Sequence, residues 1–168
     1  MKKIKHSKYI FAQWNENLEE IVRQKTAAIK NILDNSGQGF LTFSDNLLID
    51  EEYSIECEKI FGTSITGMKF SNLIYSEGEE RDYFELMLVK ILNEKKEYKK
   101  EIYLSLLPEE KIINNKYIKI SYKIIDRNLT NDEAIIMVIL TDITGKRSLE
   151  NKNVAENKVL KMVVRAVT

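Results

Sequence analysis

The sequence predicts an α+β fold built on a five-stranded, mostly antiparallel sheet with a long helix at each end of the chain. Two observations lead to this prediction. Apolar residues recur three and four positions apart near both ends and in the middle of the chain, which is typical of amphipathic helices. In the second half they alternate along the chain, which is typical of strands. Two strands precede the middle helices and three follow them, an order that favours antiparallel pairing.

The first predicted helix runs from about residue 10 to residue 34. Its 3-4 spacing continues over three heptads, as in the contact seam of a coiled coil. The seam consists of Phe11, Trp14, Leu18, Ile21, Lys25, Ala28 and Ile32. A helix on the order of 35 Å long is rarely covered at both ends by one small domain. Pairing with a second copy is therefore favoured over folding onto its own domain, and both readings stay open.

A break and a hairpin follow this helix. Gly37 or Gly39 suits a left-handed C-terminal cap. Residues 40–43 and 47–49 are predicted as two strands joined by a polar turn.

Helical segments fill the middle of the chain. Residues 51–61 have helical spacing and end at Gly62, and residues 63–76 form short helical or irregular pieces. A stronger helix covers residues 79–93.

Three alternating segments come next: residues 102–107, closed by Pro108, residues 118–124 and residues 134–141. The last segment is apolar on both faces, which favours a central strand or one that a helix covers. Residues 108–111 and 126–132 are predicted as turn-rich links.

Composition narrows the functional classes. Lys and Arg number 26, and so do Asp and Glu, so the chain lacks the basic excess that nucleic-acid binders show. The single cysteine, Cys57, allows no internal disulfide and no cysteine-based zinc cluster, which favours a reducing, cytoplasmic location. No apolar run is long enough to span a bilayer.

Two stretches resemble a PAS domain. Residues 32–62, ILDNSGQGFLTFSDNLLIDEEYSIECEKIFG, resemble its opening, with a helix, a small-residue break, a hairpin and a short helix that ends in FG. Residues 139–150, ILTDITGKRSLE, resemble its end, where the last strand runs into a D-I-T motif and a signalling helix. The resemblance covers about residues 30–150. It divides the chain into an N-terminal helix (1–36), a PAS domain (37–143) and a C-terminal signalling helix (144–168).

The resemblance implies a sensory or relay module of a bacterial two-component protein, most often a histidine kinase acting in a phosphorelay. Short helices would cover one face of the sheet and enclose a small-molecule pocket. The flanking helices would pair in a homodimer and pass a conformational change to an output domain. The chain would then be cytoplasmic, or the cytosolic part of a larger, membrane-attached sensor.

On the same basis, the pocket is expected between the sheet and the short helices. Its expected lining is Phe43, Tyr53, Cys57, Ile60, Leu88, Ile120, Tyr122, Met137 and Ile139.

The D-I-T motif also has a physical reason. The first N–H groups of a helix need acceptors, and Asp142 and Thr144 are both good capping residues around Ile143. Arg147 or Lys146 is close enough in sequence to pair with Asp142. The motif is therefore expected to cap the helix. As a signalling junction it would also be a two-state switch, which the family resemblance implies.

Enzymatic chemistry is not indicated. Cys57 lies in SIECEKIFG, unlike the adduct-forming cysteine of flavin light sensors, and the only histidine, His6, lies outside the predicted domain, which leaves no axial haem ligand within it. Neither a metal nor a catalytic constellation is predicted, and kinase activity would belong to parts of a parent protein outside this chain. The identity of any ligand stays open. The alternative is a dimerisation or interaction scaffold whose core is filled by its own side chains.

We expect the chain to sediment as a dimer that Leu18→Glu or Ile21→Glu weakens, because each change places a charge in the apolar seam. A monomer at high micromolar concentration would contradict the seam.

Overall fold

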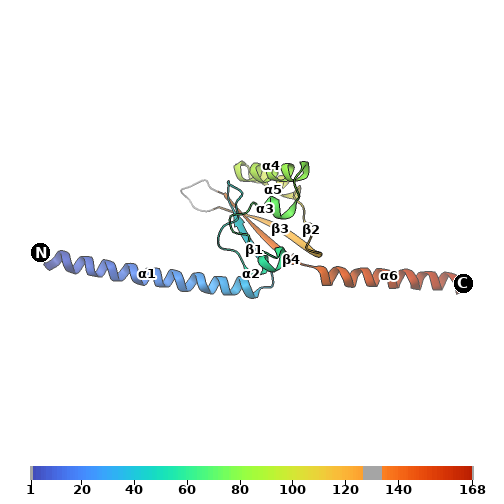
Figure 1. Cartoon of the computed structure of the whole chain (residues 1–168), viewed down its shortest axis with the longest axis horizontal. Coiled ribbons are helices and arrows are strands. Elements are labelled where there is room, and N and C mark those ends of the chain that lie inside the picture. The colour runs from blue at the N-terminus through green and yellow to red at the C-terminus, as the bar shows by residue number, and fades with distance from the viewer. Residues whose placement is uncertain (1, 127–133, 168) are drawn as a thin grey trace. The chain divides into compact units, whose positions relative to one another are not determined.

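A computed structural model of the chain describes residues 2–126 and 134–167. The chain divides into two compact units, Met1–Ser36 and Gly37–Thr168. Figure 1 shows the elements of each unit in chain order. The described residues form six helices and four strands.

The first unit is one helix, α1 (Lys2–Asn35), in agreement with the predicted long helix. It is followed by Gly37, which has a φ of 68° and so supplies the expected left-handed residue. The seam side chains Trp14, Leu18 and Ile32 are exposed, since a single helix has no second element of its own unit to pack against. The side chain of Phe11 lies outside the described residues.

Ala27 offers a matched control for the expected dimer. It is nine residues after Leu18, so successive steps of about 100° place it on the opposite face of α1. Ala27→Glu introduces the same charge as Leu18→Glu, and it should leave the sedimentation coefficient unchanged.

The second unit is built on a four-stranded antiparallel sheet in the order β1-β4-β3-β2. The strands are β1 (Gly39–Phe43), β2 (Glu110–Ile113), β3 (Lys116–Asp126) and β4 (Ala134–Asp142). The long strands β3 and β4 are central. Residues 118–124 and 134–141 were both predicted as strands, and a central or helix-covered position was expected for the second. The predicted link at 126–132 lies outside the described residues, apart from Asp126, which ends β3.

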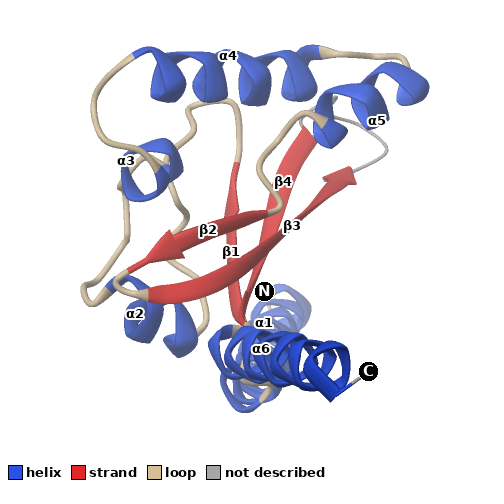
Figure 2. Cartoon of the chain, turned by 90° about the vertical axis from the view of Figure 1, so that its right-hand side faces the viewer, coloured by secondary structure: helices blue, strands red, loops and turns tan. Residues whose placement is uncertain are grey.

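Four helices lie between β1 and β2 in sequence. They are α2 (Ile55–Phe61), α3 (Phe70–Ile74), α4 (Glu79–Asn93) and α5 (Glu97–Ser105). Helix α4 begins and ends as predicted, and α2 ends at Gly62, whose φ of 76° closes the helix through a hydrogen bond from its N–H to the Glu58 carbonyl. The last helix, α6 (Thr144–Val167), follows β4 directly. Figure 2 shows α4 and α5 toward one end of the sheet and α6 at the opposite end.

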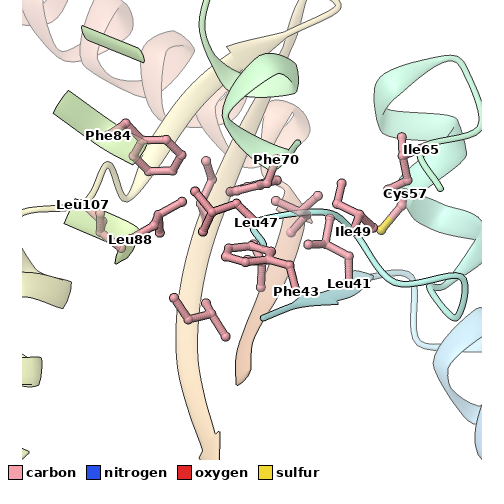
Figure 3. Close-up of a cluster of buried hydrophobic side chains, with 14 of the residues drawn as sticks. Leu41, Phe43, Leu47, Ile49, Cys57, Ile65, Phe70, Phe84, Leu88 and Leu107 are labelled. Atoms are coloured by element: carbon pink, nitrogen blue, oxygen red, sulfur yellow. The ribbon is translucent and has the colours of Figure 1, made fainter. Parts of the chain in front are cut away.

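The core lies between one face of the sheet and helices α2 to α4. Figure 3 shows a part of it, which includes Leu41 and Phe43 of β1, Phe70 of α3 and Leu88 of α4. The core residues of the two central strands are Ile118, Ile120, Ile136, Val138 and Leu140, and all are at most 1% exposed. The sheet therefore presents one fully covered apolar face.

The predicted strand at 102–107 is a helix in the structure, since these residues lie in α5 and the turn that follows it. Nearly every residue in the stretch is apolar, so the alternating and the helical pattern both fit. The helix places Lys100, Tyr103, Leu104 and Leu107 inward at 3-4 spacing, and leaves Ile102 exposed.

The strand β2 was instead expected to be part of a turn, at residues 108–111. It pairs with β3 through a two-residue turn at Asn114 and Asn115, which have φ values of 49° and 62°. Positive φ at both turn positions is the signature of the hairpin turn that matches strand twist, and asparagine tolerates it. The side chain of Asn114 also donates a hydrogen bond to the Ile60 carbonyl, 3.0 Å away.

The five-stranded prediction is not confirmed. Residues 47–49 make only isolated bridges, from Ile49 to Phe43 and from Leu48 to Lys69, and form no named strand. With residues 102–107 helical and residues 110–113 extended, four strands remain among the described residues.

Two alanine substitutions test which face of β4 is buried. Ile136 is completely buried and Ile139 lies on the opposite face. We expect Ile136→Ala to lower the free energy of unfolding by about 2–5 kcal/mol and Ile139→Ala by about 1 kcal/mol, as measured by urea denaturation. A larger loss for Ile139→Ala would contradict this assignment of faces.

Candidate functional site

The strongest candidate site is the junction between β4 and α6. The carboxylate of Asp142 accepts a hydrogen bond from the Thr144 N–H at 2.9 Å and so caps the helix, as expected. The hydroxyl of Thr144 accepts a hydrogen bond from the N–H of Tyr117 in β3 at 2.9 Å. The N–H of Ile143 donates to the carbonyl of the same Tyr117 at 2.8 Å. Two hydrogen bonds, one to the N–H and one to the carbonyl of Tyr117, thus hold the start of α6 on the backbone of β3.

The ion pairs of the junction differ from the expectation that Arg147 or Lys146 pairs with Asp142. Lys116 of β3 lies 3.6 Å from the Asp142 carboxylate. Arg147 pairs with Glu110 of β2 and lies 3.6 Å from Glu150 of its own helix. Arg147 projects from the first turn of α6, so its side chain lies nearer to β2 than to the capping residue.

These contacts shift the pKa values of Asp142 and Arg147. Side-chain and backbone hydrogen bonds from Thr144, with a smaller contribution from Lys116, hold the pKa of Asp142 below its usual value. The hydrogen bond with Glu110 raises the pKa of Arg147. Both groups are therefore charged throughout the neutral range. A surface cleft of about 260 Å³ lies beside them, and it is lined by Glu110, Lys119, Ile143, Lys146, Arg147 and Glu150.

The residues expected around a ligand pocket are mostly brought together. Five of them belong to the buried core: Phe43, Cys57, Ile60, Leu88 and Ile120. Tyr53 and Tyr122 are partly buried and pack against that core.

Met137 and Ile139 do not join this group. Strand β4 turns Ile136, Val138 and Leu140 to the core, so the intervening residues lie on the other face of the sheet. Their expected place beside the short helices is thus corrected by the strand register.

Aromatic side chains of the core pack closely against one another in this group. The rings of Phe43 and Phe70 stack with centroids 5.7 Å apart, and Phe70 lies 6.0 Å from Phe84. All three are at most 2% exposed. Figure 3 shows the labelled apolar side chains of this cluster turned toward one another. The arrangement matches a core filled by its own residues.

The two tyrosines of the expected pocket have structural partners. The Tyr53 hydroxyl donates to Glu58 at 2.8 Å and accepts from the N–H of Ile65 at 3.3 Å, which fixes the loop after α2. The Tyr122 hydroxyl donates to the Pro108 carbonyl at 3.2 Å, and burial raises its pKa, with a smaller contribution from Tyr75.

Three residues that hold the elements of this unit together were not predicted from the sequence. Ser54 is fully buried, accepts a hydrogen bond from the Phe40 N–H and donates to the Gln38 carbonyl, so it joins β1 to α2. Glu110 and Tyr117 anchor α6. The Asn-Asn turn at 114–115 could have revealed the β2–β3 hairpin that brings Glu110 and Tyr117 near the junction.

The described residues hold no group of three or more His, Cys, Asp or Glu side chains that could bind a metal ion. Within the same described part, no helix has the length and apolar content that a bilayer crossing demands.

Cys57 should be unreactive in the folded protein. Its side chain is fully buried, with Sγ 3.4 Å from the Phe40 carbonyl, and burial raises the thiol pKa to about 11, partly offset by a hydrogen bond with Ser54. A thiol pKa two units higher leaves about 100-fold less thiolate at neutral pH. We expect iodoacetamide to alkylate Cys57 at least about 100-fold more slowly than a cysteine placed on exposed α6 by Ser148→Cys, by mass spectrometry. Equal rates in the folded protein would contradict this burial.

No family model matches the sequence, and no curated protein matches it. Solved structures with some similarity include the E. coli DhaR(N)-DhaL complex, with a TM-score of 0.45 and 10% identity over 76% of this chain and 39% of that one. They also include the PAS domain of nitrogen regulation protein NR(II) from Vibrio parahaemolyticus, with a TM-score of 0.42 and 16% identity over 68% of this chain and 96% of that one. At these values, neither likeness assigns a family or a function to the chain.

Proposed function

We propose that the chain is a non-enzymatic relay module of a two-component, histidine-kinase-type signalling protein. In this role, a change in the sheet alters the start of α6, and the flanking helices of two copies carry the change to an output domain. The proposal builds on the PAS resemblance of residues 139–150 and on one structural observation. That observation is the attachment of the first turn of α6 to two strands, through Tyr117 of β3 and Glu110 of β2.

This attachment suits a relay because it couples the helix to strand pairing. The Tyr117 N–H and carbonyl both point to the junction, and their partners Thr144 and Ile143 are consecutive residues. A shift of β3 relative to β4 would break or reposition both hydrogen bonds together. Packed elements with two discrete arrangements are the physical basis of such transmission.

A second candidate function is a dimerisation scaffold that relays nothing. The filled core around Phe43, Phe70 and Phe84 favours it over a sensor that binds its ligand there. Both functions keep α1 as the pairing element. They differ in whether α6 responds to the sheet.

Substitutions of Thr144 test the coupling. Thr144→Val removes the oxygen that accepts from Tyr117, whereas Thr144→Ser keeps it. We expect amide hydrogen exchange of residues 146–150 to become about fivefold faster in Thr144→Val, the equivalent of one lost hydrogen bond of about 1 kcal/mol. Thr144→Ser should exchange as the unaltered chain does.

A change within the sheet separates the two functions. Ile120→Val deletes one methyl group from the core face of β3. If the chain is a relay, Ile120→Val should speed amide hydrogen exchange in the first turn of α6 by more than its loss of global stability explains. This excess should vanish when Ile120→Val is combined with Thr144→Val. If residues 146–150 respond only as much as α4 does, the chain is a scaffold and the relay proposal is wrong.

A further inference from the structure

A second cleft lies among the helices, away from the junction. Its volume is about 210 Å³, and it lies where the end of α3, the first half of α4 and the segment after α5 meet. Figure 2 shows α3 and α5 next to α4. The lining residues are Tyr75, Glu80, Tyr83, Phe84, Met87, Leu106, Leu107 and Pro108.

The inner wall of the cleft is fixed. Phe84 and Met87 are 2% and 3% exposed, and the rings of Tyr75 and Phe84 meet at 53° with centroids 5.3 Å apart. The Pro108 carbonyl accepts the hydrogen bond from Tyr122, which ties this wall to β3. At the rim, Tyr83 is 54% exposed, so its ring is open to a ligand.

The lining side chains of the cleft carry a negative charge. Glu80 is the one charged side chain among the eight lining residues. It follows Glu79 in the first turn of α4, which also holds Asp82, while the nearby Arg81 pairs with Glu77 at 3.4 Å. Glu80 and Tyr83 are three residues apart on a helix and so share one face.

The structure already holds a cation on one of these rings. The ammonium of Lys111 in β2 lies 3.8 Å from the ring centroid of Tyr75, within the range of a cation–π interaction. Lys111 does not line the cleft, and its charge opposes a second cation on Tyr75. A further cation in this cleft would therefore contact Tyr83 and Glu80 and not Tyr75.

From these observations we infer that the cleft is a binding site for a small organic cation of the quaternary ammonium class. The ring of Tyr83 contacts the methyl groups, Glu80 balances the charge, and Met87 and Leu106 complete the apolar wall. The volume of about 210 Å³ is below the roughly 300–1,000 Å³ of sites for drug-sized ligands, so the ligand has few heavy atoms. This site does not depend on the relay function proposed above.

The test is a titration of the full ¹⁵N-labelled chain with choline, followed by amide chemical shifts. The matched comparison is 3,3-dimethylbutan-1-ol, which has the same shape with carbon in place of the charged nitrogen. We expect saturable shifts around Tyr83 and Leu106 with choline, and binding of the neutral alcohol weaker by about 2- to 30-fold, as the range of cation–π interactions implies.

Variants at exposed positions assign the contacts. Tyr83→Leu and Glu80→Gln should each weaken choline binding by about two- to fivefold, whereas Tyr98→Leu on exposed α5 should leave it unchanged. Equal affinity for choline and the neutral alcohol would overturn the inference. So would unchanged choline affinity in both cleft variants, or the lack of saturable shifts in the unaltered chain.

Discussion

The antiparallel pairing of β3 with β4 is the constraint on which the rest of the second unit depends. It joins nine residue pairs, from Ile118 opposite Asp142 to Asp126 opposite Ala134. The side-chain period of a strand is two, so this register alone decides which residues enter the core. It also ends β4 beside the first residues of β3, and α6 consequently starts within hydrogen-bonding distance of Tyr117. A slip by one residue would bury the wrong face of β4 and separate the helix from its anchor.

Elements with one unambiguous period were predictable from the sequence, and those with two compatible periods were not. Helix α4 and the long strands β3 and β4 have clear patterns and agree with the structure. Residues 102–107 are apolar at almost every position, so tertiary packing of α5 decided between strand and helix. Strand β4 was predicted as a strand, but it is apolar on both faces, so its pattern did not show which face enters the core, and Met137 and Ile139 were assigned to the core.

At the candidate junction, only the contacts between residues close in sequence were predictable. The capping role of Asp142 follows from helix chemistry and from residues adjacent in sequence. Its partner Lys116 and the anchor Tyr117 come from the far end of another strand, and Glu110 comes from a strand that the sequence did not reveal. Short-range spacing favoured Arg147 as the partner of Asp142, whereas the sheet offered Arg147 a carboxylate on β2. The partner of Arg147 was therefore decided by the pairing of β2 with β3, which no local sequence pattern reveals.

The core and the junction of the second unit are held by different kinds of contact. The core is packed with apolar side chains, among them the stacked rings of Phe43 and Phe70, whereas hydrogen bonds and ion pairs hold the place where β4 passes into α6. Segments with few buried apolar contacts open locally more easily than a packed core, so we expect the start of α6 to open before the central strands do.

Tyr117 holds α6 through its main-chain groups, and this has a consequence for how the sequence can change. Almost any side chain at position 117 leaves the N–H and carbonyl in place, and proline alone would remove the donor. Related chains are therefore free to vary this residue while they keep the attachment. The residue at position 144 is more restricted, because its side chain must carry an oxygen that accepts from the strand and must also fit the helix start. The hydrogen bond between positions 117 and 144 therefore restricts the residue type at position 144 but hardly at position 117.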